Sequence, residues 1–333
     1  MKYIIFLFLL NFASITAQKN ASFQQEPSIE DLTRLLTQNI ANDSLKVVAI
    51  YDWITVNIQY DRYFRRRIEG DTTLTQEPDY VVKSKKAVCI GYAKLVTEMC
   101  HLANISAVII EGFAKGDGQN VDTDEHAWNA VKINKNWYLI DATWGSSGSF
   151  YAKKYFLSPP SVFVETHLPH DPIWQLSDQV IGFECFMNGK NCGSDKKRIF
   201  QYQDSLAVWA TLDSFSQSYN EATRILNYNP KDIRAMRQLA EYYGKTAMAF
   251  FSRYAQIRQE VKDKIRQPDN QQSVLQLLES ASENLLKAKE QYQRILPFAK
   301  KNRYTDAHMN IDLIEENLAN IEHEKAFVLK YFR

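Results

Sequence analysis

The sequence lacks an excess of charge of either sign. Lysine and arginine number 40 and aspartate and glutamate 39, for a formal net charge of +1. A nucleic-acid-binding protein usually gathers a basic excess on one face, so we expect no nucleic acid as a partner. Glycine is scarce, at 11 of 333 residues, and no glycine-rich loop of the kind that cradles phosphate occurs. Hydrophobic residues make up 45% of the chain, which is typical of a folded globular protein.

The sequence also lacks a long apolar run, so we expect no membrane span in the mature chain. A short run lies at the start, where Lys2 precedes the apolar stretch from Ile4 to Leu10 and small residues follow up to Ala17. This pattern predicts a cleaved signal peptide over residues 1–17 rather than a membrane anchor. The expected location is therefore secreted or periplasmic.

Cysteine is rare, with 4 residues in the chain. In an oxidising compartment, Cys185 and Cys192 can close a short disulfide loop. Cys100 follows Cys89 by 11 positions, which on a helix is three turns along the same face. Those two sulfur atoms are then too far apart to pair, and we expect Cys100 to be a small core residue. Cys89 remains without a partner, and an unpaired thiol in an exported protein indicates a chemical role.

Apolar periodicity predicts an α+β domain followed by an all-α domain. We place the first over residues 18–195 and the helical domain over residues 196–333, where Asn229-Pro230 between two apolar helical halves resembles a tetratricopeptide junction. The predicted elements of the first domain are a helix capped by Ser28, a helix over Ser44–Asn57, a loop over residues 61–80, a helix from Val88 or Cys89 to about Leu102, and strands over Ser106–Phe113, His126–Ile133 and Trp137–Thr143.

A cysteine, a histidine and an acid fall at positions that suit nucleophilic catalysis. Cys89 lies in the first turn of its predicted helix, where unpaired amides and the helix dipole favour the thiolate. His126 can take the thiol proton and return it to a leaving group. Asp141 follows it by 15 residues and can hold the far nitrogen of the imidazole.

The length of one turn decides whether the acid can reach the histidine. With a two-residue turn at Asn134-Lys135, His126 lies opposite Thr143, and Asp141 points to the same face. Such diagonal neighbours lie roughly 7–8 Å apart. A three-residue turn would put Asp141 on the opposite face.

Several sequence words in this order resemble the transglutaminase-like superfamily, in particular its bacterial secreted members. They span about residues 45–178 and comprise AIYDWI at residues 49–54, VCIGYA at 88–93, HAWN at 126–129, WYLIDATW at 137–144, YFL at 155–157, HLP at 167–169 and WQL at 174–176. The resemblance implies a papain-like fold with Cys89 as nucleophile, His126 as base and acid, and Asp141 as the group that orients the imidazole. It further implies acyl transfer through a thioester, on protein or peptide substrates.

Further candidate site residues concern the oxyanion and the substrate groove. Gln76 or Tyr80 is a candidate for stabilising the oxyanion, together with the backbone amide of Cys89. The candidates for a substrate groove are Gln76, Tyr80, Tyr92, Trp128 and Trp144, although tryptophans on strands more often serve packing.

The sequence leads us to expect no cofactor and no metal. His167, His170 and Asp171 lie close together in the chain, but two histidines and one carboxylate without fixed geometry do not define a metal site.

Three functions stay open at this point: an acyltransferase, a cysteine peptidase or amidase, and a catalytically silent binding module. Each is compatible with a protein partner on the C-terminal helices.

Overall fold

The computed structural model describes residues 27–64, 74–115, 121–188, 198–263, 271–296 and 305–331. The predicted signal peptide, residues 1–17, lies outside these ranges. The chain divides into two compact units, Met1–His167 and Leu168–Arg333. The sequence had suggested a division near residue 195. The earlier boundary arises because the segment after His167 packs on later helices: Trp174 lies against Trp209, with ring centroids 5.2 Å apart.

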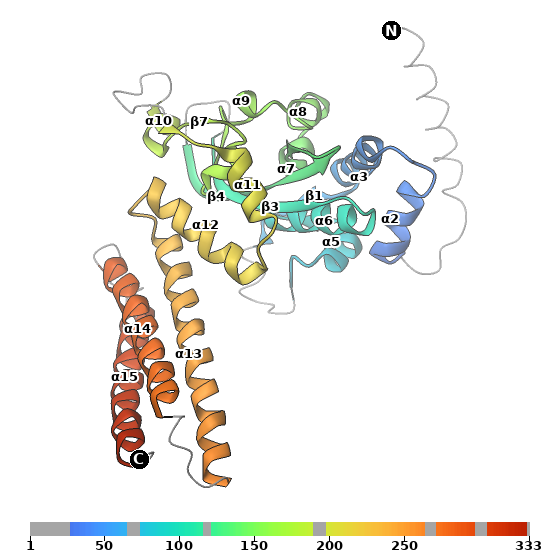
Figure 1. Cartoon of the computed structure of the whole chain (residues 1–333). Helices are drawn as coiled ribbons and strands as arrows, with labels where there is room; N and C mark the ends of the chain where they lie inside the picture. Colours follow the sequence, from blue (N-terminus) through green and yellow to red (C-terminus); the bar gives the residue numbers. More distant parts are fainter. Residues whose placement is uncertain are drawn as a thin grey trace. The chain divides into compact units, whose positions relative to one another are not determined.

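The first unit combines helices with a small antiparallel sheet (Figure 1). Its helices are α2 (Ile29–Thr37), α3 (Asp43–Asn57), α5 (Pro78–Ser84), α6 (Cys89–Leu102), α7 (Ala142–Gly145), α8 (Ser149–Lys154) and α9 (Pro160–Phe163). Its strands are β1 (Gln59–Tyr60), β2 (Lys86–Ala87), β3 (Ala107–Lys115), β4 (Val121–Ile133), β5 (Asn136–Ile140) and β6 (His167–Pro169), which begins at the last residue of the unit.

The first helices begin where the sequence predicts. The Ser28 side chain accepts a hydrogen bond from the Asp31 amide and caps α2. The helix α3 begins at Asp43, one residue before the predicted start. The predicted loop over residues 61–80 is wrong at its end, because Pro78 opens α5. Proline suits the first helical position, where its missing N–H leaves no bond unmade.

The helix α6 has the predicted bounds, with Val88 as its N-cap and Cys89 as its first residue. Its apolar face is fully buried and includes Tyr92, Leu95 and Met99. Cys100 is also buried and free, as expected. Burial of this face against the sheet and the neighbouring helices fixes where the first turn of α6 points.

The sheet has the order β5-β4-β3-β6. The β4–β5 hairpin has the predicted register, with Ile133 opposite Asn136. Asn134 and Lys135 form the two-residue turn with φ of 49° and 73°, as a type I′ turn requires. However, β5 ends at Ile140 rather than at Thr143, because Asp141 leaves the sheet to cap α7. The β4–β5 pairing therefore stops at Asn129 and Ile140, and the predicted pairing of His126 with Thr143 is wrong. On its other side, His126 pairs with Gly112 of β3.

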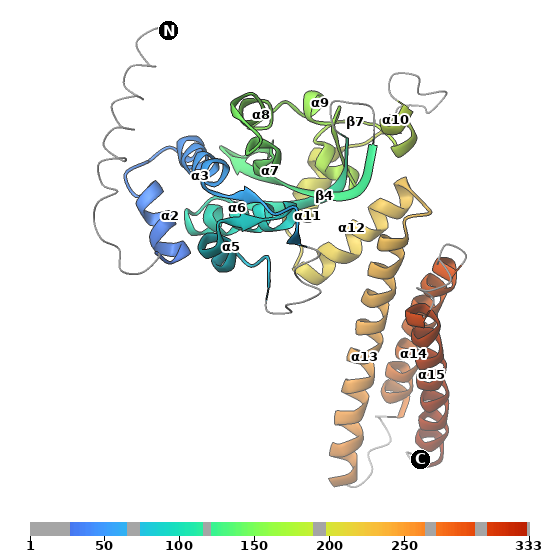
Figure 2. The same ribbon diagram turned by 180° about the vertical axis from the view of Figure 1, so that it is seen from behind.

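The two faces of the sheet are covered differently (Figures 1 and 2). The helix α6 packs on one face, where the Asn129 side chain donates to the Ala93 carbonyl at 2.9 Å. Trp128 faces the other way and lies against Phe163, with ring centroids 6.1 Å apart. Strand alternation thus separates a face anchored to α6 from a face lined with aromatic rings.

The second unit is mainly helical, as the sequence predicts, and α13, α14 and α15 lie side by side (Figures 1 and 2). The helix α13 alone has 31 residues, close to the roughly 34 that a whole two-helix tetratricopeptide repeat occupies. The predicted tetratricopeptide character therefore does not match these long helices. The elements of this unit are η2 (Pro172–Gln175), β7 (Gln179–Val180), α10 (Phe183–Asn188), β8 (Arg198–Ile199), α11 (Tyr202–Trp209), α12 (Ser214–Tyr228), α13 (Ile233–Asp263), α14 (Gln271–Ile295) and α15 (Thr305–Tyr331).

Two further sequence expectations concern the whole chain. None of the helices within the described ranges combines the length and the apolarity needed to cross a bilayer. Cys185 is disulfide-bonded, and Cys192, its predicted partner, lies outside the described residues.

Candidate active site

Cys89 occupies the first position of α6 and is partly exposed. Burial raises the pKa of its thiol, but the hydrogen bond and charge of His126 lower it by more, helped by backbone hydrogen bonds with Ala127 and Ile90. The net pKa of Cys89 lies below its ordinary value. A helix start and a cationic neighbour favour the same ionised form, so this thiol is suited to act as a nucleophile.

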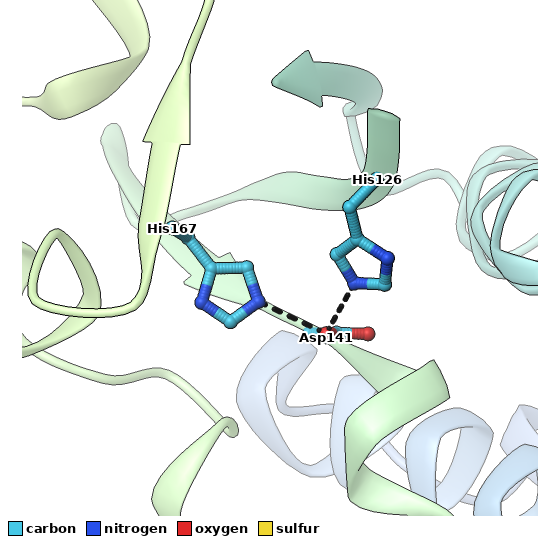
Figure 3. Close-up of side chains that lie close together, drawn as sticks. All are labelled: His126, Asp141 and His167. Carbon is cyan, nitrogen blue, oxygen red and sulfur yellow. Dashed lines mark hydrogen bonds and ion pairs between the residues drawn. The ribbon is translucent and has the colours of Figure 1, made fainter. Parts of the chain in front are cut away.

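His126 lies on β4 with a side chain that is 10% exposed. Its Nε2–H donates to Asp141 Oδ2 at 2.8 Å, because an ionised carboxylate can only accept. The other ring nitrogen points away from the carboxylate (Figure 3) and is left for the hydrogen bond with Cys89. Burial lowers the pKa of His126, but the charge and hydrogen bond of Asp141, with those of Cys89, raise it to about 9. The imidazole is thus protonated at neutral pH.

Asp141 is fully buried yet well supplied with hydrogen-bond donors. Its Oδ1 accepts from the amides of Thr143 at 2.8 Å and Trp144 at 3.2 Å, as the N-cap of α7. Burial raises the pKa of Asp141, but the charges and hydrogen bonds of His126 and then of His167 lower it by more, so the net pKa lies far below the ordinary value. The sequence predicted a meeting of Asp141 and His126 across two strands. The structure brings them together just beyond the end of β5.

Gln76 reaches the first turn of α6 from the segment before α5. Its Oε1 accepts a hydrogen bond from the Val88 amide at 2.8 Å, and the side chain is 8% exposed. A Cβ atom at Gly91 would collide with the Gln76 carboxamide, so the glycine of the CxGY word makes room for this side chain. Tyr80 lies half-buried on α5. Gln76 is therefore placed beside the start of the Cys89 helix.

The aromatic groove candidates lie in different environments. Tyr92 is 1% exposed and donates to the Ile58 carbonyl at 2.6 Å, so it belongs to the core and lines no groove. Trp128 is also 1% exposed and stacks on His126, with ring centroids 6.0 Å apart, so it supports the imidazole from beneath. Trp144 is partly exposed, and its ring centroid lies 5.6 Å from that of His126. Of these rings, Trp144 is the one that is partly exposed beside His126.

A second histidine, His167, also binds Asp141. His167 Nε2–H donates to Asp141 Oδ2 at 3.1 Å (Figure 3). In the sequence, His167 opens the HLP word at residues 167–169 and lies near His170 and Asp171, and neither pattern assigned it a role in the site. Asp171 instead pairs with Arg224 at 2.7 Å within the second unit. No sequence pattern shows that β6 lies next to β3, and that neighbourhood brings His167 to Asp141.

The two histidines and the aspartate also provide ligand types that zinc uses. Their ligand atoms lie within 4.8 Å of one another. The two hydrogen bonds to Asp141 Oδ2 account for this proximity, and a cation would have to replace both. We therefore assign no metal to this group.

A cysteine at a helix start and a histidine–aspartate pair beside it define a cysteine–histidine–acid site. Residues 30–142 match the family model of the transglutaminase-like superfamily, and this range contains Cys89, His126 and Asp141. The N-terminal part of the chain therefore carries a transglutaminase-like core.

Curated relatives are similar to part of the chain. Human "Kyphoscoliosis peptidase" is 34% identical over 162 residues, which cover 44% of this chain and 24% of that protein. "Lim and transglutaminase domain protein ltd-1" of Caenorhabditis elegans is 28% identical over 173 residues, covering 45% of this chain and 23% of that protein. The chain thus spans about a quarter of the length of these relatives.

Two solved structures are also similar over part of their length. A candidate cysteine protease from Cytophaga hutchinsonii has 29% identity and a TM-score of 0.28, covering 34% of this chain and 36% of that one. A transglutaminase structure has 17% identity and a TM-score of 0.28, covering 41% of this chain and 38% of that one.

Proposed function

We propose that the first unit is a cysteine-nucleophile enzyme that acts on amide bonds of protein or peptide substrates through a thioester. One observation carries the proposal: Cys89 interacts with an imidazole whose far nitrogen donates to a fully buried carboxylate at 2.8 Å. This arrangement supplies an activated nucleophile, a proton carrier and a group that fixes the tautomer of the carrier.

The chemistry follows from these positions. The Cys89 thiolate attacks the carbonyl carbon of an amide, and the oxygen gains a negative charge. As the C–N bond breaks, the His126 imidazolium gives the proton on the nitrogen facing Cys89 to the leaving amine, and a thioester remains. Water or a second amine then attacks the thioester and gives its proton to His126. The C–S bond breaks, and the thiolate–imidazolium pair is restored.

The start of α6 can stabilise the oxyanion of both tetrahedral intermediates. The Cys89 amide is one of the N–H groups that have no partner inside the helix. We propose Gln76 as the second contributor, since it is held at this helix start by its bond to the Val88 amide. Preorganised donors of this kind are typically worth roughly 10²–10³-fold in rate.

We favour hydrolysis over cross-linking as the outcome. One of the curated relatives reported above has a name that states a peptidase. Water and an amine compete for the same thioester, so the geometry of the triad alone serves either reaction. Binding of a protein partner to the C-terminal helices stays a prediction.

We also propose that the protein is exported. The proposal rests on the N-terminal pattern of residues 1–17 and on disulfide-bonded Cys185, since structural disulfides persist in oxidising compartments. A thiol nucleophile is compatible with such a compartment, because Cys89 forms no disulfide within the described part of the chain.

The test is alkylation of the full mature chain with iodoacetamide from pH 5 to 10, with peptide mass spectrometry to locate the label. We expect fast labelling of Cys89 near pH 6.5, and slower labelling in the His126→Ala variant. Cys100 is an internal control, because burial raises its pKa to about 12. Equal and slow labelling of Cys89 in both proteins would refute the enzyme and favour the silent binding module.

A second assay separates the two outcomes of the thioester. Casein is incubated with the enzyme and a fluorescent primary amine, and both new peptide N-termini and incorporated amine are measured. Hydrolysis predicts new N-termini that disappear in the Cys89→Ala variant. Incorporation of the amine without cleavage would instead establish the acyltransferase.

A further inference from the structure

The Asp141 carboxylate is shared between two histidines. Its Oδ2 accepts from His126 Nε2–H at 2.8 Å and from His167 Nε2–H at 3.1 Å, and its Oδ1 is taken by backbone amides. The two imidazole rings lie 5.5 Å apart by centroid, on either side of the carboxylate (Figure 3). The mechanism proposed above uses only one of them.

The surroundings of His167 favour one neutral tautomer. Its side chain is 0% exposed, and its Nδ1 lies 2.9 Å from the Thr166 hydroxyl. That hydroxyl can donate its one proton to Nδ1, which is nearer than its other acceptor, the Phe163 carbonyl at 3.4 Å. Burial lowers the pKa of His167 to about 4, outweighing the hydrogen bond from the ring to Asp141. Nδ1 is then the acceptor and Nε2 carries the proton that Asp141 needs.

The packing around His167 holds the ring in place. Phe163 and Trp144 lie 4.3 and 4.6 Å from it by centroid. Two other titratable groups face it, Tyr155 with a ring centroid at 5.2 Å and Lys154, whose charge opposes protonation of the imidazole. These surroundings therefore favour a neutral His167 ring that donates from Nε2 to Asp141.

We infer that His167 is a positioning residue for the Cys89–His126–Asp141 site, which holds Asp141 Oδ2 in line with the His126 imidazole. The inference rests on the proposed function, because it assigns the role through Asp141. Among the aromatic rings around His167, an unbonded polar side chain would cost free energy, since a buried polar group is unfavourable unless it is hydrogen-bonded. Hydrogen bonds at both ring nitrogens of His167 offset that cost, and the one donated by Nε2 goes to a buried anion.

Loss of the His167 donor has a definite expected consequence. A buried carboxylate oxygen that loses one of two donors can turn toward its remaining surroundings, and the contact with His126 then weakens. A weaker His126–Asp141 contact destabilises the imidazolium and, with it, the Cys89 thiolate. We expect the pH at which Cys89 becomes reactive to rise by about one unit, which is a tenfold slower alkylation below that pH.

The experiment compares His167→Leu with His167→Gln in the full chain. Glutamine keeps an N–H donor at about the reach of Nε2, whereas leucine removes the donor and keeps a similar volume. The rate constant of Cys89 alkylation by iodoacetamide is measured from pH 5 to 10. Leucine should shift the midpoint upward by about one unit, and glutamine should restore it to within about threefold of the wild-type rate at pH 6.5.

The outcomes separate the inference from the proposed function. Two results would overturn the role of His167 while wild-type alkylation still depends on His126. One is an unshifted pH midpoint of Cys89 alkylation in the leucine variant. The other is an equal loss of alkylation rate in both variants with an unchanged pH profile. Failure of the proposed function would show in the wild type itself. If the leucine variant does not fold, nitrogen-15 NMR of wild-type histidines decides. A neutral Nε2–H ring at His167 from pH 5.5 to 8 supports the inference, and an Nδ1–H ring contradicts it.

Discussion

Replacement of Asp141 by asparagine tests the geometry of the site most directly. The Thr143 and Trp144 amides donate to Oδ1, so the asparagine oxygen must occupy that position. The asparagine NH₂ group then takes the place of Oδ2 and points at the Nε2 atoms of His126 and His167. A donor in this place forces both rings to accept.

The consequence for His126 is a change of tautomer. If its Nε2 accepts, its proton moves to the nitrogen that faces Cys89, and that nitrogen can no longer take the thiol proton. The imidazolium also loses its carboxylate. The pKa of His126 is about 9 against an ordinary 6.5, raised first by Asp141 and then by Cys89. The whole upward shift corresponds to about 3 kcal/mol, and Asp141→Asn should remove most of it.

The expected result is a loss of Cys89 alkylation of about 10²-fold or more at pH 6.5. The loss should shrink at pH 10, because a thiol ionises there without help from the histidine. The assay uses iodoacetamide with Cys89→Ala as the baseline, and circular dichroism confirms that Asp141→Asn is folded. A folded variant with a wild-type rate at pH 6.5 would refute the reasoning.

Three further predictions concern packing and stability. Gly91→Ala should lower stability by about 1–3 kcal/mol, because the added Cβ would collide with Gln76. Gly244→Ala, whose Cβ meets open space on α13, should raise stability by about 0.5–1 kcal/mol. Thermal unfolding of both variants checks this, and equal effects would contradict it. Tyr92→Phe should lower the free energy of unfolding in urea by about 1 kcal/mol, because the lost hydroxyl donates to a backbone carbonyl. Alkylation of Cys89 should be unchanged. Slower alkylation would show that Tyr92 takes part in the site. The pKa of His167 lies at about 4, below its ordinary 6.5, so the unfolded chain binds more protons and His167 should lower stability by up to about 3 kcal/mol as the pH drops through this window. Burial also lowers the pKa of His170, to about 3, so urea unfolding of His167→Gln should show a smaller slope than the wild type, and an equal slope would refute the assignment.

Much of the site follows from local sequence patterns. Apolar periodicity predicts α6 with Cys89 in its first turn, and the structure begins that helix at Cys89. The pair Asn134-Lys135 predicts a two-residue turn, and both residues adopt the positive φ of that turn. Helix starts and tight turns depend on a few neighbouring residues, so the sequence alone determines them.

The remaining features depend on residues far apart in the chain. Strand alternation placed Asp141 on a continuing strand, whereas it leaves the sheet and caps α7. Tyr92 and Trp128 could not be told from groove residues, because only tertiary packing buries them. His167 lies 26 residues after Asp141 in sequence and reaches it because β6 lies beside β3. The sequence by itself determined the place of Cys89 at the start of α6, the place of His126 on β4 and the turn that joins β4 to β5. The tertiary structure decided how the carboxylate is held and which second histidine shares it, since pairing of distant strands leaves no local pattern.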